Sequence, residues 1–256
     1  MVSSKKSALP TARLWKGVHK FMINYAHRGA SEYAPENTLS SFYLGLLQGA
    51  NGIETDVQMT KDGVLVLFHD DTIGRVTDAQ GEIADYTYEQ LRQVKVYGNS
   101  VTGFYDRIIT LETFLEVFAG YDICFAIELK KAGVEKGVIE AIRRHGIADR
   151  TTVTSFCFEY LKNVKEMAPD IRVGWLVAGD GLDQIEQLLA IDGEEMAPQA
   201  AYISEASVKA LRDAGLGVRA WGGSSQDLMK KTCGLKVDGM TVNFPDRLTV
   251  YLKSAV

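Results

Sequence analysis

Short apolar runs alternate with longer segments of helical periodicity along most of the chain. The short runs are rich in β-branched and aromatic residues and favour strands, whereas apolar residues spaced three and four apart favour helices. The pattern predicts strands at 21–27, 52–58, 64–69, 123–130, 151–156, 172–177, 200–203, 218–221 and 239–243. It predicts helices at 38–48, 111–118, 134–144, 159–167, 182–189, 205–214 and 226–232. Such alternation is typical of a parallel sheet covered by helices.

The third predicted strand departs from this alternation. Only residues 59–63 separate it from the second strand, which leaves no room for a helix, and their Lys-Asp-Gly sequence is typical of a hairpin turn. The third strand is therefore expected to run antiparallel to the second, outside the parallel set. Reflection about Asp62 places His69 opposite position 55, level with Glu54 and Asp56.

The length of the chain and its strand order indicate one domain. A chain of 256 residues matches a (β/α)8 barrel, which typically needs about 250 residues. We predict a single TIM-type (β/α)8 barrel domain over residues 1–256, with a β-hairpin and a small insertion after strand 2. The polar, glycine-containing residues 70–109 form this insertion and are expected over the barrel mouth. Inside it, Thr87 and Gln90 match a capping box and predict a short helix. Residues 1–20 are an N-terminal extension.

Composition restricts location and partners. The formal charge of -5 makes a nucleic-acid partner unexpected, because such binding rests largely on basic contacts to phosphate. Cys124, Cys157 and Cys233 lie far apart and form no CxxC pair, which fits a reducing compartment. We find no signal peptide and no stretch approaching the ~20 apolar residues of a membrane span. We therefore expect a cytoplasmic protein without stable membrane association, and its oligomeric state is left open.

Carboxylates occupy the predicted inner face of two strands. Glu54 and Asp56 alternate with Ile53 and Val57, so the acids share one face and the apolar residues the other. Two acids facing the barrel interior repel each other unless a cation joins them, although a solvated edge strand is an alternative. With Glu128 they supply three hard oxygen ligands, which suit one divalent cation, Mg2+ or Ca2+.

Basic residues accompany these acids. His27 ends the first strand, at the barrel end where active sites lie, and the adjacent Arg28 suits acid/base chemistry on a bound anion. Taken alone, a histidine at a strand end is more often structural. His69 ends the hairpin, where a surface turn is the alternative to a site residue. Lys130 shares a strand face with Glu128, either as a buried ion pair or as a group that meets a phosphate.

The order and spacing of these motifs resemble the glycerophosphodiester phosphodiesterase family. The resemblance extends over nearly the whole chain from about residue 21. It is carried by His27-Arg28-Gly29, Pro35-Glu36-Asn37-Thr38, Glu54 with Asp56, Thr60-Lys61-Asp62-Gly63, His69-Asp70, Glu128 with Lys130, Val218-Arg219-Ala220-Trp221, Val237-Asp238-Gly239 and Pro245-Asp246-Arg247. It implies a (β/α)8 barrel with a small insertion after the hairpin. It also implies hydrolysis of a small-molecule glycerophosphodiester to glycerol 3-phosphate and an alcohol.

The resemblance also implies roles for individual residues. The implied roles are general acid and base for His27 and His69, cation binding for Glu54, Asp56 and Glu128, and substrate binding for Arg28, Lys130 and Trp221. Glu36 is expected to orient the site, and Asn37 to cap the helix that follows it. The chain departs from the family pattern at Gly222-Gly223-Ser224, at Asn243 and at Asn51, which bear on the pocket rather than on the proposed ligands or histidines.

Three alternatives share part of this pattern. A phospholipase-D-like enzyme or cyclising lyase acting on a phospholipid uses the same barrel, two histidines and one metal. A non-catalytic barrel binding protein predicts loss of a histidine or an acid from the set, and all are present. A metal-dependent sugar isomerase or aldolase shares the cation and the lysine, but it does not require His27, Arg28 and His69 together.

Overall fold

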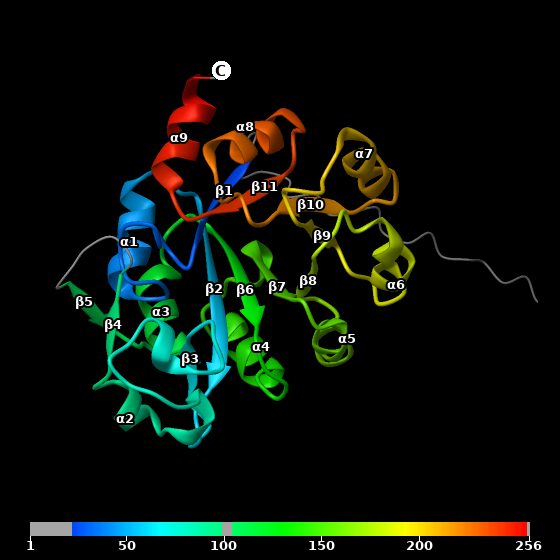
Figure 1. Cartoon of the computed structure of the whole chain (residues 1–256). Coiled ribbons are helices and arrows are strands. Elements are labelled where there is room, and N and C mark those ends of the chain that lie inside the picture. Colours follow the sequence, from blue (N-terminus) through cyan, green and yellow to red (C-terminus); the bar gives the residue numbers. More distant parts are fainter. Residues whose placement is uncertain (1–21, 99–103, 255–256) are drawn as a thin grey trace, which may run out of the picture.

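Eight parallel strands form a closed barrel in the computed structural model, which describes residues 22–98 and 104–254. The barrel strands are β1 (Ile23–His27), β2 (Gly52–Met59), β6 (Cys124–Leu129), β7 (Thr151–Ser155), β8 (Arg172–Val177), β9 (Glu195–Pro198), β10 (Gly217–Ala220) and β11 (Gly239–Val242). The ring closes because β1 pairs with both β11 and β2. Helices surround the ring (Figure 1), so the predicted TIM-type (β/α)8 barrel is confirmed.

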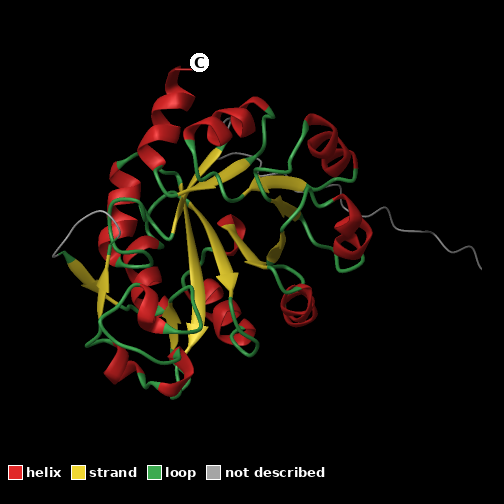
Figure 2. Ribbon diagram, viewed as in Figure 1, coloured by secondary structure: helices red, strands yellow, loops and turns green. Residues whose placement is uncertain are grey.

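The helices follow the strands in the predicted alternation (Figure 2). They are α1 (Leu39–Leu47), α3 (Leu111–Phe118), α4 (Glu135–Arg144), α5 (Phe158–Met167), α6 (Ile185–Leu189), α7 (Glu205–Asp213), α8 (Gln226–Gly234) and α9 (Pro245–Ser254), with single 3-10 turns η3 (Ala148–Arg150) and η4 (Leu182–Gln184). The last helix was not predicted, although its first residues were recognised as a motif. Ser204 is the N-cap of α7, and its side chain accepts a hydrogen bond from the backbone N–H of Ser207.

The hairpin has the predicted direction and register. β3 (Leu65–Leu67) runs antiparallel to β2 and pairs Val57 with Leu67, which corresponds to reflection about Asp62. The turn requires Gly63, whose φ of 80° lies in the left-handed region. Beyond the paired residues, the backbone N–H of Phe68 still donates to the carbonyl of Asp56 at 3.1 Å. The hairpin therefore carries the next residue of the chain toward the acids of β2.

The predicted strand at 200–203 is wrong. The strand in this part of the chain is β9, and the predicted segment forms a turn after it. The physical reason is an inward-facing acid: Glu195 begins β9 and forms an ion pair with Arg219 of β10 at 2.8 Å. A buried charge pair contributes no apolar signal to either strand. The more apolar residues that follow therefore attracted the prediction.

The insertion after the hairpin has its own elements. They are η1 (Ile73–Arg75), η2 (Ile83–Asp85), α2 (Tyr88–Leu91), β4 (Lys95–Tyr97) and β5 (Tyr105–Arg107). An apolar cluster that includes Val66 of β3 holds these elements beside the hairpin (Figure 1, cyan and teal). The predicted capping box of Thr87 and Gln90 is confirmed. The N-terminal extension 1–20 and the first residue of the predicted strand 21–27 lie outside the described residues.

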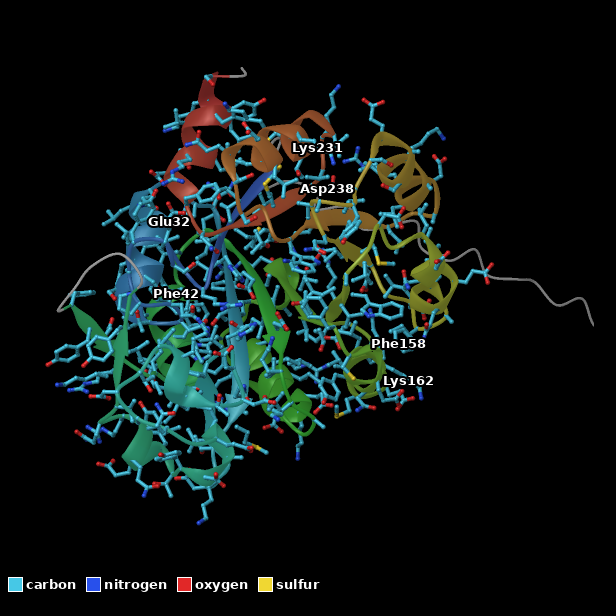
Figure 3. All side chains as sticks on the ribbon, viewed as in Figure 1. Glu32, Phe42, Phe158, Lys162, Lys231 and Asp238 are labelled. Atoms are coloured by element: carbon cyan, nitrogen blue, oxygen red, sulfur yellow. The ribbon has the colours of Figure 1, made fainter. Side chains whose placement is uncertain are left out.

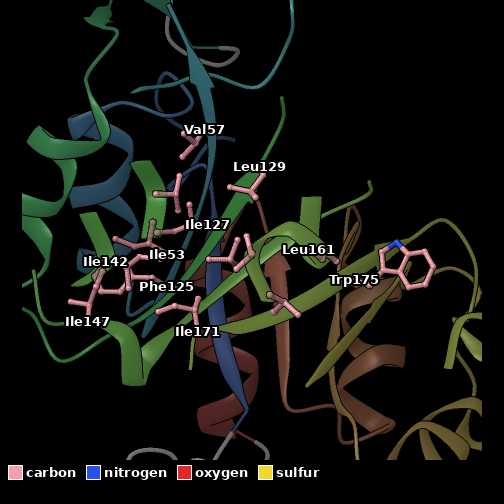
Figure 4. Close-up of a cluster of buried hydrophobic side chains, with 14 of the residues drawn as sticks. Ile53, Val57, Phe125, Ile127, Leu129, Ile142, Ile147, Leu161, Ile171 and Trp175 are labelled. Atoms are coloured by element: carbon pink, nitrogen blue, oxygen red, sulfur yellow. The ribbon is translucent and has the colours of Figure 1, made fainter. Parts of the chain in front are cut away.

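The main apolar core lies between the strands and the surrounding helices. Ile53 and Val57 of β2 pack there with Ile127 of β6 (Figure 4). Phe42 on α1 is buried, whereas Lys231 on α8 lies exposed on the outside (Figure 3). Because this core takes the outward faces of the strands, the alternate positions of β2 and β6 point into the barrel. No helix within residues 22–98 and 104–254 has the length and apolar character needed to cross a bilayer.

Candidate active site

Three acidic side chains from neighbouring strands meet inside the barrel. Glu54 and Asp56 occupy alternate positions of β2, and the parallel register places Asp56 opposite Glu128 of β6. All three residues are buried. One oxygen from each carboxylate lies within 4.8 Å of the others. The structure thus brings together the three acids that the sequence analysis assigned to a cation.

Burial changes the protonation of this cluster. Burial raises the pKa of Glu128 to about 7, and the Asp56 carboxylate adds to the increase. Burial and the two neighbouring carboxylates raise the pKa of Glu54 well above its usual range. Burial acts in the same direction on Asp56, but Arg28 and Lys130 outweigh it and lower its pKa to about 2. Without a cation, protons therefore neutralise part of the charge of the cluster near neutral pH.

One oxygen of the cluster lacks a hydrogen-bond partner. Asp56 Oδ1 is buried and accepts no hydrogen bond, and Nζ of Lys130 lies 3.8 Å from it. The other oxygen, Oδ2, accepts a hydrogen bond from Nδ2 of Asn37 at 2.9 Å. A buried carboxylate oxygen without a partner is costly, whereas oxygen ligands are what hard divalent cations prefer. The residues present therefore fit the predicted cation.

Both predicted histidines reach this end of the barrel. In the parallel register His27 lies opposite Glu54, and its Nε2 is 3.9 Å from Oε2 of that residue. Nδ1 of His27 lies 2.5 Å from Oδ1 of Asn243, and Nδ1 of His69 lies 2.5 Å from Oδ1 of Asp70. Burial, together with the adjacent arginine, lowers the pKa of His27 to about 4. In each imidazole, Nδ1 therefore lies within hydrogen-bond distance of a side-chain oxygen.

A left-handed turn follows the first histidine. Arg28 has a φ of 54° and Gly29 a φ of 82°. A Cβ on Gly29 would lie 2.4 Å from the backbone of Ser41 in α1, so only glycine fits there. The turn brings Nε of Arg28 to 3.0 Å from Oδ2 of Asp56. The guanidinium thus lies beside the acid cluster, as expected for a group that meets an anion.

The prediction that Asn37 caps the helix that follows it is wrong. Thr38 is the N-cap of α1, and its side chain accepts a hydrogen bond from the backbone N–H of Ser41. Asn37 has a φ of 57°, and this backbone conformation turns its side chain toward β2. There Nδ2 donates to Asp56, and Oδ1 accepts a hydrogen bond from Oγ1 of Thr55 at 2.8 Å. Asn37 therefore orients an acid of the cluster.

Glu36 and Lys130 each pair with a charged residue of the site. Oε1 of Glu36 accepts a hydrogen bond from Nη1 of Arg28 at 3.0 Å. Nζ of Lys130 donates to Oε1 of Glu128 at 2.7 Å. The interpretation of Glu36 as an orienting residue agrees with this contact. Lys130 forms the ion pair that the sequence analysis considered, beside the acids.

A pocket of about 300 Å³ lies at this end of the barrel. His27 and His69 line it together with two of the acids. Phe156 and Trp221 also line the pocket; their rings meet edge to face with centroids 5.1 Å apart. The indole Nε1 of Trp221 donates to the carbonyl of Val177 at 3.0 Å, which holds the ring in place. Trp221, predicted to bind substrate, thus lies in the pocket wall.

Sequence reasoning named two further pocket residues, Arg219 within a family motif and Asn243 as a departure from the family pattern, but assigned neither of them a contact in the site. Arg219 is 1% exposed; its Nε donates to Glu195 at 2.8 Å and its Nη1 to Oγ1 of Thr241 at 2.9 Å. Asn243 was expected to bear on the pocket rather than on the histidines; that expectation is wrong, because Oδ1 of Asn243 lies at hydrogen-bond distance from Nδ1 of His27. A charged residue inside a short apolar strand was the available signal for Arg219. Its partner could not be identified, because β9 was placed five residues too late.

Together the fold and the site define a class of protein: a (β/α)8 barrel with a pocket at which buried carboxylates, two histidines and basic side chains meet. The glycerophosphoryl diester phosphodiesterase family model matches residues 27–247. A glycerophosphodiester phosphodiesterase of Caldanaerobacter subterraneus subsp. tengcongensis is 31% identical over 231 residues, which cover 87% of this chain and 94% of the relative. One from Bacillus altitudinis is 35% identical over 240 residues, covering 87% and 95%. The chain therefore belongs to the glycerophosphoryl diester phosphodiesterase family. It is an enzyme, a phosphoric diester hydrolase, and not a non-catalytic barrel.

Solved structures share the fold. A phosphodiesterase of Oleispira antarctica, solved in complex with the product sn-glycerol-3-phosphate, has a TM-score of 0.83 and 28% identity, and the match covers 91% of this chain and 97% of that one. A putative glycerophosphodiester phosphodiesterase of Galdieria sulphuraria has a TM-score of 0.81 and 27% identity, covering 92% and 100%. The resemblance stated from the motifs is thus confirmed over nearly the whole length.

Proposed function

We propose that this enzyme hydrolyses glycerophosphodiesters to glycerol 3-phosphate and an alcohol, with one divalent cation and with two histidines as general acid and base. One observation carries the proposal: three buried carboxylates converge at the pocket that both His27 and His69 line. The relative of Oleispira antarctica, which binds sn-glycerol-3-phosphate, supports the same product here.

Two basic side chains are placed to neutralise a phosphodiester. The diester resists nucleophiles because it is an anion, so positive groups that meet its growing charge lower the barrier. Arg28 and Lys130 are 14% and 15% exposed in their side chains, so they remain partly open to a ligand. The planar guanidinium can bind two phosphate oxygens at once, whereas the ammonium acts as a point charge.

The acid cluster is proposed to hold the cation, Mg2+ or Ca2+. Glu54, Asp56 and Glu128 would supply the oxygen ligands, and Asn37 would keep Asp56 oriented. When bound, the ion polarises a phosphoryl oxygen as a Lewis acid. The unpartnered Oδ1 of Asp56 and the raised pKa values of the two glutamates support this assignment.

The histidines are proposed to transfer protons at their free nitrogens. Oxygen acceptors at Nδ1 of both rings favour the tautomer whose lone pair is on Nε2. One ring, neutral, takes the proton of the nucleophile at its Nε2, and the other, protonated at both nitrogens, gives its Nε2 proton to the oxygen of the leaving alkoxide. Each positioned transfer is typically worth about 10²–10⁴ in rate. A neutral alcohol leaves far more readily than an alkoxide. A second histidine is therefore needed as the proton donor, beside the one that acts as base.

The rest of the proposal concerns the surroundings of the site. Trp221 and Phe156 provide an apolar wall for the substrate. We propose that the insertion, of which residues 70–98 and 104–109 are described, lies over the barrel mouth of a single domain. The free thiols of the three cysteines support a cytoplasmic location. The mildly acidic charge argues against a nucleic-acid partner, and no stable membrane association is expected.

A coupled assay for glycerol 3-phosphate tests the function. Purified enzyme is screened against diesters with choline, ethanolamine and other alcohols, with and without chelator, and phospholipid vesicles are included. Turnover of a soluble diester that chelation abolishes and Mg2+ or Ca2+ restores is expected. Glu128→Gln should be inactive, whereas Glu140→Gln, an exposed residue of α4 paired with Lys136, should match the wild type. Turnover of vesicles alone would replace the proposal by the lipid alternative, and full activity in metal-free enzyme would remove the cation.

A further inference from the structure

One arginine of the insertion joins two functional groups of the site. Nη1 and Nη2 of Arg75 donate to the two carboxylate oxygens of Glu36 at 3.0 Å and 2.6 Å. The same Oε1 of Glu36 also accepts the hydrogen bond from Arg28. At another edge of the same guanidinium group, Nε of Arg75 donates to Oδ2 of Asp70. Oδ1 of Asp70 in turn contacts Nδ1 of His69. A continuous series of side-chain contacts therefore links Arg28 to His69 through Glu36, Arg75 and Asp70.

The planar shape of the guanidinium suits this arrangement. Its two terminal nitrogens form a fork that meets one carboxylate with two parallel hydrogen bonds, while Nε is free to meet a second carboxylate. Arg75 uses both edges in this way, one for Glu36 and one for Asp70. The angle between the two carboxylates is thereby set by a rigid group. A lysine, with a single ammonium, cannot reproduce that geometry.

The backbone that carries Arg75 is itself fixed. Ile73 in the same 3-10 turn is fully buried in the apolar cluster of the insertion. Its backbone N–H donates to the carbonyl of Gly81 at 2.9 Å, and its carbonyl accepts from Oγ1 of Thr77 at 2.7 Å. On the other side, Nε2 of buried Gln58 donates to the carbonyl of Asp70 at 2.7 Å. The backbone beside Arg75 and the backbone of Asp70 are thus both held by packing or hydrogen bonds.

We propose that Arg75 is a positioning residue of the reaction: through Asp70 it sets the ring of His69, and through Glu36 it sets the guanidinium of Arg28. The insertion therefore holds the proton-transfer group and the phosphate-binding group in one fixed relation. This inference rests on the proposed function, because it takes His69 and Arg28 to act on the substrate. Near-attack geometry of this kind contributes to kcat rather than to binding alone.

Kinetics of Arg75→Ala and Arg75→Gln test the inference. Partners behind a functional group typically contribute about 10–100-fold to activity, so both variants should lose kcat to this extent with a smaller change in KM. Arg75→Lys should remain low. The side chain of Arg75 is 44% exposed, so millimolar guanidinium in solution should reach the gap in Arg75→Ala and restore part of kcat. Arg92→Ala is the matched control, because Arg92 lies in the same insertion and pairs only with exposed Glu89 among the described residues.

The outcomes separate this inference from the proposed function. If the wild type turns over no glycerophosphodiester, the proposed function fails. If the wild type is active and Arg75→Ala or Arg75→Gln keeps kcat within twofold, or Arg75→Lys is fully active, the inference is overturned. A readout without substrate is the exchangeable Nδ1 proton of His69 in NMR spectra, assigned by its absence from His69→Ala. We expect this resonance to shift or vanish in Arg75→Gln and to persist in Arg92→Ala, and an unchanged resonance would also overturn the inference.

Discussion

Replacement of Asn37 by alanine tests how the acid cluster is held. The side chain of Asn37 donates to Oδ2 of Asp56 and accepts from the hydroxyl of Thr55. Both partners are fully buried, so water cannot replace the lost hydrogen bonds. The backbone at Asn37 is also left-handed, with a φ of 57°, a conformation that asparagine tolerates better than alanine does. The substitution therefore removes these two hydrogen bonds, together with a longer one from the backbone N–H of Asp56 at 3.4 Å, and adds backbone strain.

The expected loss of stability follows from these terms. A hydrogen bond to a charged group contributes about 1.5–3 kcal/mol and one between neutral groups about 0.5–1.5 kcal/mol. The left-handed conformation adds about 1 kcal/mol for alanine. We therefore expect the free energy of unfolding of Asn37→Ala to fall by roughly 3–5 kcal/mol. Urea unfolding in the presence of chelator measures this change without a contribution from bound cation.

Two control variants separate the causes. Asn37→Gly loses the same hydrogen bonds but adopts the left-handed backbone freely, so it should be more stable than Asn37→Ala by about 1 kcal/mol. Thr38→Ala removes the actual N-cap of α1 and should cost about 1 kcal/mol while leaving cation affinity unchanged. If the free energy of unfolding of Asn37→Ala falls by less than about 1 kcal/mol and the variant binds the cation as the wild type does, the conclusion that Asn37 holds Asp56 in place is wrong.

Three further predictions concern the chemistry. Cation affinity, measured by calorimetry on chelator-treated enzyme, should strengthen as pH rises through about 7, because protonated Glu128, whose pKa is raised to about 7, must lose its proton to bind the ion; affinity that is flat from pH 6 to 8 would exclude this ligand set. His27→Ala and His69→Ala should each lower kcat at least about 100-fold with little change in the thermal unfolding midpoint, and wild-type kcat in either variant would remove that histidine from the mechanism. A 2-deoxy glycerophosphodiester should be a very poor substrate if the glycerol 2-hydroxyl attacks phosphorus first, since that attack has the advantage of an intramolecular reaction. Comparable binding and kcat for both substrates would instead assign the attack to water.

Local pattern alone predicted the fold class and the positions of several candidate site residues. The hydrophobic periods of strands and helices depend on residues only a few positions apart. The sequence by itself therefore shows the alternation of strands and helices that is typical of a (β/α)8 barrel. Alternation within β2 placed Glu54 and Asp56 on the inner face, and the length of the hairpin turn was enough to place His69. These inferences held because each depends on geometry that repeats within one element or one short turn.

Tertiary structure alone decided which distant residues support that site. The role of Asn37 depends on a left-handed backbone and on contact with a strand about 20 residues later, and neither is visible in a capping pattern. Glu195 and Arg219 form an ion pair across two strands, so β9 lacked the apolar signal that marks the other strands. Arg75 resembles any polar residue of a surface segment until the insertion packs it between Glu36 and Asp70. Periodicity reports which face of an element is buried, whereas a hydrogen bond between distant residues depends on distances that only the packed chain defines.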